Sequence, residues 1–297
     1  MNQTKKVFVA IDFSPASDEA LKQAHDRALS MGAELGVCHI IPNELRSNVL
    51  FPHLGSDAAM SIPVELERAA EAVAKRVSEL TGRSSEHASI IVDHGTPYAE
   101  ILKAAEKWQA DVIVIGSHGM TSAAGLLLGS VTHKVIRYAH STVLVVRSHK
   151  GGRVVAGTDF SDPALPAVAA AVNEARRMKC PLTIVHSVNL GFPTASHGVM
   201  AFGGPAPMLS DESIDVLKRG AQDRLLEALR KFDMEGDTVV TTGPAGIALV
   251  TIARDVNASL VVVGTRGGTG LERVLLGSVA ETVAGESPCS VMITRLH

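Results

Sequence analysis

The chain has 297 residues, of which 46% are hydrophobic and 20% charged, and its formal net charge is −3. Such a composition suits about two globular domains, each able to bury a core. An acidic chain with only 3% aromatic residues argues against a nucleic-acid partner, which needs a basic face or stacking platforms. No apolar run approaches the roughly 20 residues that span a bilayer, so no membrane segment is expected.

The N-terminus and the cysteines together predict a cytoplasmic protein. Residues 1–6 lead directly into an apolar strand and lack the pattern of a signal peptide. Cys38, Cys180 and Cys289 are far apart, and each lies in or beside an apolar run. We interpret them as reduced structural thiols, because no spacing among them supports a redox or metal role.

The first half of the chain alternates between strand and helix patterns. Short apolar runs predict strands at 6–11, 35–41, 87–92, 111–115 and 142–147. Helical spacing predicts helices at 15–31, 63–81, 97–108 and 130–138, the first of them with apolar residues at that spacing: Ala20, Leu21, Ala24, Ala28 and Leu29. Residues 42–61 show no clear period. This alternation indicates βαβ units and a mainly parallel sheet.

A glycine-rich stretch after the fourth strand is the most informative part of this half. Gly116-Ser117-His118-Gly119 follows the apolar run at 112–115, and Gly129-Ser130 comes after nine further residues, where a helix is expected to begin. Glycines let the main chain approach a ligand closely. The first N–H groups of a helix have no internal partner and lie at the positive end of its dipole. The stretch therefore predicts a site for a phosphate.

The second half repeats this arrangement at a constant distance. Gly264-Thr265-Arg266-Gly267 follows the apolar run at 260–263, and Gly277-Ser278 comes nine residues after it. Positions 116 and 264, like 129 and 277, differ by 148 residues. Asp-Phe-Ser at 12–14 recurs at 159–161, and His39 recurs as His186, both 147 residues later. Two copies at a fixed offset are far stronger evidence than one glycine spacing.

The other elements of the second half follow the same order. Strands are predicted at 153–158, 182–186, 239–244, 260–263 and 289–294, with a helix opened by Pro163. A long helix at 211–232 is expected to bury the stripe Leu217, Leu225, Leu226 and Leu229, and the glycine- and proline-rich residues 190–210 are expected to form a loop over the site. The linker at 148–152 is short, so two domains, 1–149 and 150–297, should stay in contact.

An open doubly wound sheet is the fold class that this order favours. In such a sheet, ligands bind at the carboxyl ends of the strands where the winding reverses. With a strand order of 3-2-1-4-5, the reversal lies between the first and fourth strands, which end at Asp12 and Gly116. The carboxylate and the glycine loop would then face one crevice.

These motifs resemble the universal stress protein family, as two fused copies that cover essentially the whole chain. The Gly-x-x-Gly-x9-Gly-Ser pattern, present in both copies, resembles the ATP-binding branch of that family. The resemblance implies a Rossmann-like, five-stranded, doubly wound parallel sheet in each half, with a pseudo-two-fold relation between the halves. Family members usually pair through their fifth strands, which implies such a pair inside this chain and leaves a further homodimer open.

The resemblance also implies an adenine-nucleotide site in each half. Asp12 and Asp159 would accept hydrogen bonds from the ribose or the adenine edge, and Ile40 and Ser187 would lie beside the adenine. Ile115, Gly116, Val263 and Gly264 would cover the ring or the ribose. The backbone N–H groups of four glycines would bind the phosphates: Gly119, Gly129, Gly267 and Gly277. Ser130 and Ser278 would add a hydroxyl and the helix N-terminus. His118 and Arg266 occupy the variable loop position, where Arg266 could pair with a phosphate, and Val131 and Val279 complete the site. The first loop, at 120–124, lacks a basic residue, whereas the second carries Arg266 and Arg273.

Each of these features also has a purely structural interpretation. Asp12 and Asp159 could cap the following helices or close local turns, and glycine loops after strands can be turns alone. We interpret His39 and His186 as core histidines with satisfied hydrogen bonds, not as ligands. The twelve histidines show no metal-binding spacing, so no metal site is predicted.

The chemistry that is missing favours binding over catalysis. The sequence lacks the Gly-x-x-x-x-Gly-Lys-Ser/Thr loop and the Gly-x-Ser-x-Gly elbow, and it has no carboxylate cluster for efficient phosphoryl transfer. We therefore predict a cytoplasmic stress-response protein that binds ATP or a related adenine nucleotide, with or without Mg²⁺, in one or both domains. A slow ATPase and a nucleotide-free protein-interaction scaffold remain alternatives.

Overall fold

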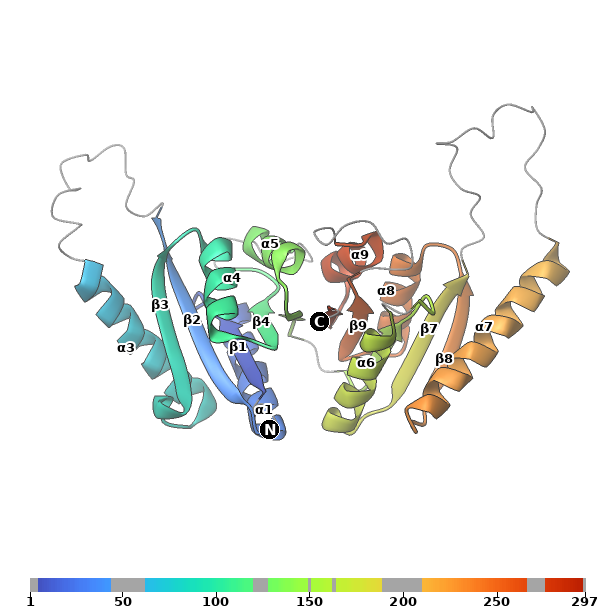
Figure 1. Cartoon of the computed structure of the whole chain (residues 1–297), viewed down its shortest axis with the longest axis horizontal. Coiled ribbons are helices and arrows are strands. Elements are labelled where there is room, and N and C mark those ends of the chain that lie inside the picture. The colour runs from blue at the N-terminus through green and yellow to red at the C-terminus, as the bar shows by residue number, and fades with distance from the viewer. Residues whose placement is uncertain are drawn as a thin grey trace, which may run out of the picture.

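A computed structural model describes residues 5–43, 62–119, 128–148, 151–161, 164–188, 210–265 and 276–295. These residues form an α/β structure in which helices cover both faces of one ten-stranded sheet (Figure 1). The two halves of the chain lie side by side along this sheet, with their fifth strands at its centre.

The first half contains five strands that alternate with helices. Its elements are β1 (Lys6–Ala10), α1 (Pro15–Met31), β2 (Glu34–Pro42), α3 (Ile62–Thr81), η3 (Ser85–His87), β3 (Ala88–Gly95), α4 (Pro97–Trp108), β4 (Val112–Gly116), α5 (Ser130–Tyr138) and β5 (Thr142–Val146). The apolar runs and helical spacings of the sequence thus predicted the strands and α-helices of this half to within a few residues, while η3 was not predicted.

The second half repeats the pattern. Its elements are β6 (Val154–Gly157), α6 (Leu165–Met178), β7 (Leu182–Val188), α7 (Asp211–Lys231), β8 (Asp237–Thr242), α8 (Ala245–Asp255), β9 (Leu260–Gly264), α9 (Ser278–Glu286) and β10 (Ser290–Thr294). The prediction that Pro163 opens a helix lies outside the described residues, among which α6 begins at Leu165. Pro166 lies in the first turn of α6, where proline is well tolerated. Helix α8 was not predicted.

Local capping explains where α1 begins and ends. Ser14 is the N-cap, and its side chain accepts a hydrogen bond from the Ser17 N–H, while Pro15 fills the first helical position. The helix ends at Gly32, which has a φ of 60° in the left-handed region that glycine adopts at low cost. The end of β1 is thereby joined to a helix whose start is fixed.

The strand order is β3-β2-β1-β4-β5-β10-β9-β6-β7-β8. All pairs within a half are parallel, so each half has the predicted order 3-2-1-4-5. The fifth strands, β5 and β10, pair antiparallel, with Leu144 opposite Met292. The two predicted five-stranded sheets are therefore halves of one continuous sheet.

The core lies in two layers, one on each face of the sheet. Residues along a strand alternate between them, so that Val7 and Val9 face one layer and Phe8 and Ala10 the other. Helices α1, α3, α6 and α7 cover the first face, and α4, α5, α8 and α9 cover the second. Each layer runs through both halves of the chain.

Three leucines of the apolar patterns are at least one third exposed, two of them from the stripe predicted as core. Leu29 is 48% exposed, Leu217 47% and Leu226 36%. Leu225 and Leu229 of the same predicted stripe are buried, because α7 rests on the sheet only along the line that these two residues share with Ala221. Leu217 lies one turn before that line, and Leu226 lies on its flank.

Candidate functional site

The candidate site lies at the carboxyl ends of β1 and β4, which are parallel neighbours in the sheet. Asp12 follows the first of these strands, and the Gly116–Gly119 loop continues from the second. A Cβ atom added to Gly119 would lie 2.5 Å from Asp12 Oδ2, so the main chain of the loop rests on this carboxylate. The fold thus brings together the carboxylate and the glycine loop that are 107 positions apart in the sequence (12 and 119).

The Asp-Phe-Ser turn closes on itself in both halves. Asp12 Oδ1 accepts a hydrogen bond of 3.0 Å from the Ser14 N–H. Asp159 Oδ1 accepts one of 3.0 Å from the Ser161 N–H and one of 2.5 Å from its hydroxyl. One carboxylate oxygen in each half therefore serves a local turn, as the structural interpretation expects, while the N-cap of α1 is Ser14 and not Asp12.

The phenylalanine of this turn adopts an unusual backbone conformation in both halves. Phe13 has a φ of 65° and Phe160 a φ of 62°, a region that bulky residues rarely enter. Their rings pack against His39 and His186, with centroids 4.8 and 4.3 Å apart. These contacts stabilise a turn that would otherwise be strained.

The two histidines also hold the main chain that leads into each aspartate. His39 Nδ1 lies 2.9 Å from the Ile11 carbonyl oxygen, and His186 Nδ1 lies 2.9 Å from that of Thr158. Because a carbonyl only accepts, each Nδ1 carries the hydrogen. The interpretation of His39 and His186 as satisfied histidines is confirmed. The sequence did not predict that these histidines position the aspartates. The signal for it was that each histidine follows the aspartate of its own half at the same distance in the sequence.

The structure corrects one expectation about the glycine loops. The Gly129 N–H donates to the Ser117 carbonyl over 2.8 Å, and the Gly277 N–H donates to that of Thr265 over the same distance. These two N–H groups close the loops, so they are not available to a phosphate. A Cβ atom added to Gly129 would lie 3.2 Å from His118 Cα. Glycine therefore allows the main chain at Gly129 to pack closely against the main chain at His118.

The helices that follow begin with uncapped N-termini. The Gly129 carbonyl accepts from the His133 N–H over 2.8 Å, and the Gly277 carbonyl accepts from the Glu281 N–H over 3.0 Å. No side chain among the described residues caps either helix. Within the described parts of the chain, no group accepts from the first three N–H groups of α5 or of α9. These groups lie at the positive ends of the helix dipoles, which makes each helix start a place for an anion.

The two glycine loops are anchored differently. The Thr132 hydroxyl, which is buried, donates to the Gly116 carbonyl over 2.7 Å and ties α5 to the end of β4. The corresponding residue of the second half is Ala280, which has no hydroxyl. There, the Thr294 hydroxyl donates to the Val263 carbonyl over a longer 3.4 Å. Sequence reasoning missed Thr132, which no motif marks.

The family model for the "Universal stress protein family" matches residues 3–147 and, a second time, residues 152–295. The chain belongs to the universal stress protein family. It is 32% identical over 153 residues to a universal stress protein of Methanocaldococcus jannaschii, which covers 48% of this chain and 94% of the relative. It is 26% identical to one of Mycobacterium tuberculosis, which covers 98% of this chain and 95% of the relative.

A solved structure shares the complete arrangement of this universal stress protein. The crystal structure of a universal stress protein from Archaeoglobus fulgidus superimposes with a TM-score of 0.64 at 22% identity. The match covers 99% of both chains. At this identity the likeness establishes the fold, including two tandem units, and the site rests on the residues described above.

The remaining predicted residues of this universal stress protein occupy different environments. Ile40, Ile115 and Val263 are buried at the ends of their strands. The Ser187 hydroxyl donates to the Gly243 carbonyl over 2.6 Å, so it is used at the exit of β8. Gly264 ends β9 opposite Thr294 of β10. Arg266, Gly267 and Arg273, with the loops at 120–124 and 190–209, lie outside the described residues.

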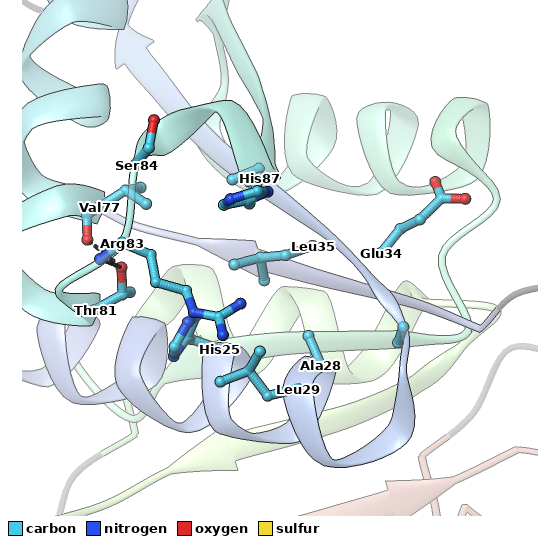
Figure 2. A pocket seen from close by; sticks show the side chains of 12 residues that line it. His25, Ala28, Leu29, Glu34, Leu35, Val77, Thr81, Arg83, Ser84 and His87 are labelled. Carbon is cyan, nitrogen blue, oxygen red and sulfur yellow. Dashed lines mark hydrogen bonds between the residues drawn. The ribbon is translucent and has the colours of Figure 1, made fainter.

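Two cavities among the described residues lie away from the candidate site. One of about 300 Å³ lies between α1, α3 and the amino ends of β2 and β3, where it is lined by residues that include His25, Arg83 and His87. Figure 2 shows the Arg83 side chain extending over His25 toward Leu29. A second hollow, of about 440 Å³, lies against Val216 and Leu217 of α7. Neither is lined by a predicted site residue.

The cysteines of this universal stress protein are free thiols with raised pKa values. Burial raises the pKa of Cys38 to about 12, and it also raises the pKa of Cys180 and of Cys289. At neutral pH these groups are protonated and poor nucleophiles, which fits structural thiols. Among the described residues, no cluster of potential metal ligands and no helix long and apolar enough to cross a membrane is found.

Proposed function

We propose that this universal stress protein binds ATP or a related adenine nucleotide at the carboxyl ends of β1 and β4, and of β6 and β9. The proposal assigns one site to each of two domains, 1–149 and 150–297. The observation that carries it is the uncapped start of α5 and α9, each following a glycine loop, with Asp12 lying against the first loop. The resemblance to the ATP-binding branch of the family supports adenine as the base.

The phosphates would bind at the helix starts. In the first site, the N–H groups of Ser130, Val131 and Thr132 and the Ser130 hydroxyl would donate to phosphate oxygens. In the second site, Ser278, Val279 and Ala280 would act in the same way. Gly129 and Gly277 would shape the loops without donating, because their N–H groups already bind Ser117 and Thr265.

The sugar and base would lie toward the ends of β1 and β2. Asp12 and Asp159 would accept hydrogen bonds from the ribose or from the adenine edge. Ile40 would contact the adenine in the first site and Ser187 in the second. Each site has one carboxylate, which suits binding of a nucleotide. The bound nucleotide would stabilise the folded state by mass action. The nucleotide-bound and nucleotide-free states would then differ in stability, and this difference would serve a regulatory or stress-protective role in the cytoplasm.

The experiment begins with freshly purified protein, which is denatured so that released small molecules can be identified by mass spectrometry. Calorimetric titration of the emptied protein with ATP, ADP, AMP and GTP then measures affinity and stoichiometry. We expect an adenine nucleotide among the released molecules and weak or absent binding of GTP. The absence of both released nucleotide and any binding heat would contradict the proposal and favour the scaffold alternative.

Hydrolysis is tested in the same preparation. Phosphate release from ATP that disappears in the Asp12→Ala, Asp159→Ala double variant would identify a slow ATPase, whereas release by a contaminant would be indifferent to the change. The expected result for a binding module is nucleotide binding without phosphate release above the level of the double variant.

A further inference from the structure

The interface between the two halves contains a symmetric set of hydrogen bonds, in which each half donates to the other from an equivalent arginine. The Arg147 guanidinium donates from Nη2 to the Ala284 carbonyl over 2.5 Å, and the Arg295 guanidinium donates from Nη2 to the Ile136 carbonyl over 2.6 Å. Each arginine thus binds the last turn of a helix in the other half, where a positive charge is favourable. Together with the antiparallel β5–β10 pair, these contacts would recur in any pairing of two such domains.

A second set of interactions is not symmetric. Arg27 of α1 and Glu174 of α6 form a bidentate ion pair, with Nη1–Oε1 and Nη2–Oε2 distances of 2.6 and 2.7 Å. Their side chains are 3% and 7% exposed. The two positions are 147 residues apart, the same offset that relates the Asp-Phe-Ser turns. Equivalent positions of the two domains therefore face each other, and they carry opposite charges.

A more exposed pair repeats this arrangement on the other face of the sheet. His133 Nε2 of α5 lies 3.3 Å from Glu281 Oε1 of α9, and these positions are 148 residues apart. This pair is largely exposed, so it contributes little by itself. It shows that a second pair of equivalent positions is also occupied by complementary residues.

The buried pair is poorly suited to stabilising the fold. Burial lowers the pKa of Arg27, and this effect exceeds the opposing attraction of Glu174. Replacing a buried ion pair by packed apolar residues is often neutral or stabilising, whereas a buried charge without its partner is strongly destabilising. A pair of this kind discriminates between partners more than it adds to stability.

We propose that Arg27 and Glu174 restrict the fifth-strand interface to pairs of one first domain with one second domain. Two first domains brought together would place Arg27 against Arg27, and two second domains would place Glu174 against Glu174. The partner that this surface accepts is therefore the other half of the same chain, or the second domain of another copy. A pair of first domains would bury two Arg27 charges of the same sign. A pair of second domains is disfavoured less strongly, because Arg177 stays beside each Glu174.

The test uses two full-length variants, Arg27→Glu and Glu174→Arg, each of which places like charges across its own interface. We expect each variant alone to unfold about 10 °C below the native chain. An equal mixture, refolded from urea, should yield a one-to-one complex of the two chains by native mass spectrometry. In that complex, each first domain faces an opposite charge on the other chain's second domain. A mixture that gives no more two-chain complex than the separate variants would overturn the proposal.

A variant that fails to refold alone does not end the test. The double reversal Arg27→Glu, Glu174→Arg in one chain should recover most of the lost unfolding temperature and remain a single-chain species. Recovery should be incomplete, because Arg177 donates to Glu174 over 2.9 and 3.0 Å and would face a positive charge. No recovery relative to the single variants would contradict the proposal.

A matched control lies within the first domain. Arg76 of α3 and Asp18 of α1 form an ion pair that does not cross the domain interface. The Arg76→Asp and Asp18→Arg chains carry the same kind of reversal, and their mixture should give no two-chain complex. A complex in this control would show that charge reversal alone promotes association and would also overturn the proposal.

Discussion

The two halves of the chain fix the Asp-Phe-Ser turn in the same way and the glycine loop in different ways. After β1 and after β6, a phenylalanine in the left-handed region packs on a histidine that binds the preceding main chain. After β4, Thr132 ties the helix to the strand end, whereas Ala280 at the same place after β9 cannot. The turn that positions the carboxylate is therefore duplicated, and the anchoring of the glycine loop has diverged.

This comparison teaches where the two sites should differ. The main-chain donors at the starts of α5 and α9 do not depend on side-chain identity, so both halves retain them. Contacts with the base do depend on side-chain identity. Beside the expected position of the base, the first half has Ile40, which is buried and apolar, and the second has Ser187, whose hydroxyl binds the Gly243 carbonyl. We expect the two sites to share phosphate recognition and to differ in their contacts with the base.

The largest expected effect is that of Gly119→Val. The new side chain would collide with the Asp12 carboxylate, which lies 2.5 Å from the position of the added Cβ. ATP binding in the first half should weaken by about 100-fold, or about 2.7 kcal/mol, while the second half is unaffected. Calorimetric stoichiometry measures this. Gly152→Ala is the control, because no atom lies within 4 Å of its added Cβ.

The negative charge of Asp12 and Asp159 should make the next largest contribution to nucleotide affinity. Asp12→Asn and Asp159→Asn keep an oxygen for the local turn with Ser14 or Ser161 and remove the negative charge. Each should weaken nucleotide binding in its own half by about tenfold or more, the usual loss for a hydrogen bond to a charged group of about 1.5–3 kcal/mol. Equal affinity in the native chain and the double variant would contradict the assigned role.

The histidines should contribute mainly to stability. His39→Phe and His186→Phe keep an aromatic ring against Phe13 or Phe160 and leave the Ile11 or Thr158 carbonyl without its donor. We expect a loss of about 1.5 kcal/mol in the free energy of unfolding for each variant, measured in urea. Similar losses of stability in the two variants would support a duplicated turn. A loss in only one variant would contradict the conclusion that the two turns are stabilised in the same way.

The smallest effect concerns the threonine that only the first half has. Thr132→Val removes the hydrogen bond to Gly116 and should cost about 1 kcal/mol of unfolding free energy. The matched change Ala280→Thr places a hydroxyl at the equivalent position of α9. If the new hydroxyl binds the end of β9, the nucleotide affinities of the two halves should become more similar. No change in either variant would show that this anchor does not distinguish the loops.

Much of the fold could be predicted from the sequence, because buried parallel strands appear as short apolar runs and the repeat confirmed each of them. The strand order of each half followed from the doubly wound pattern. The exposure of Leu29 and Leu217 could not be predicted, because helical spacing alone does not reveal how much of a helix the sheet covers. The ion pair of Arg27 with Glu174 was also missed, since charged residues on helices are usually exposed.

The candidate site was predictable in its residue types and only partly in its hydrogen bonds. The recurrence of Asp-Phe-Ser and of the glycine spacing located the strand ends correctly. Which N–H groups remain for a ligand depends on the loop conformation, and the sequence contains no signal that Gly129 would bind Ser117. The prediction about Gly129 and Gly277 failed for this reason, while the helix starts that follow them fit the expectation.

The most direct test of the account is to follow backbone amide resonances of the ¹⁵N-labelled protein as ATP is added. The account predicts that the amides of Ser130 and Val131, and of Ser278 and Val279, shift most, because a phosphate gives them an acceptor that the described residues do not provide. The amides of Arg83 and His87, which line the separate cavity, should not move. ATP binding that leaves both helix starts unperturbed would contradict the assignment of the phosphate sites.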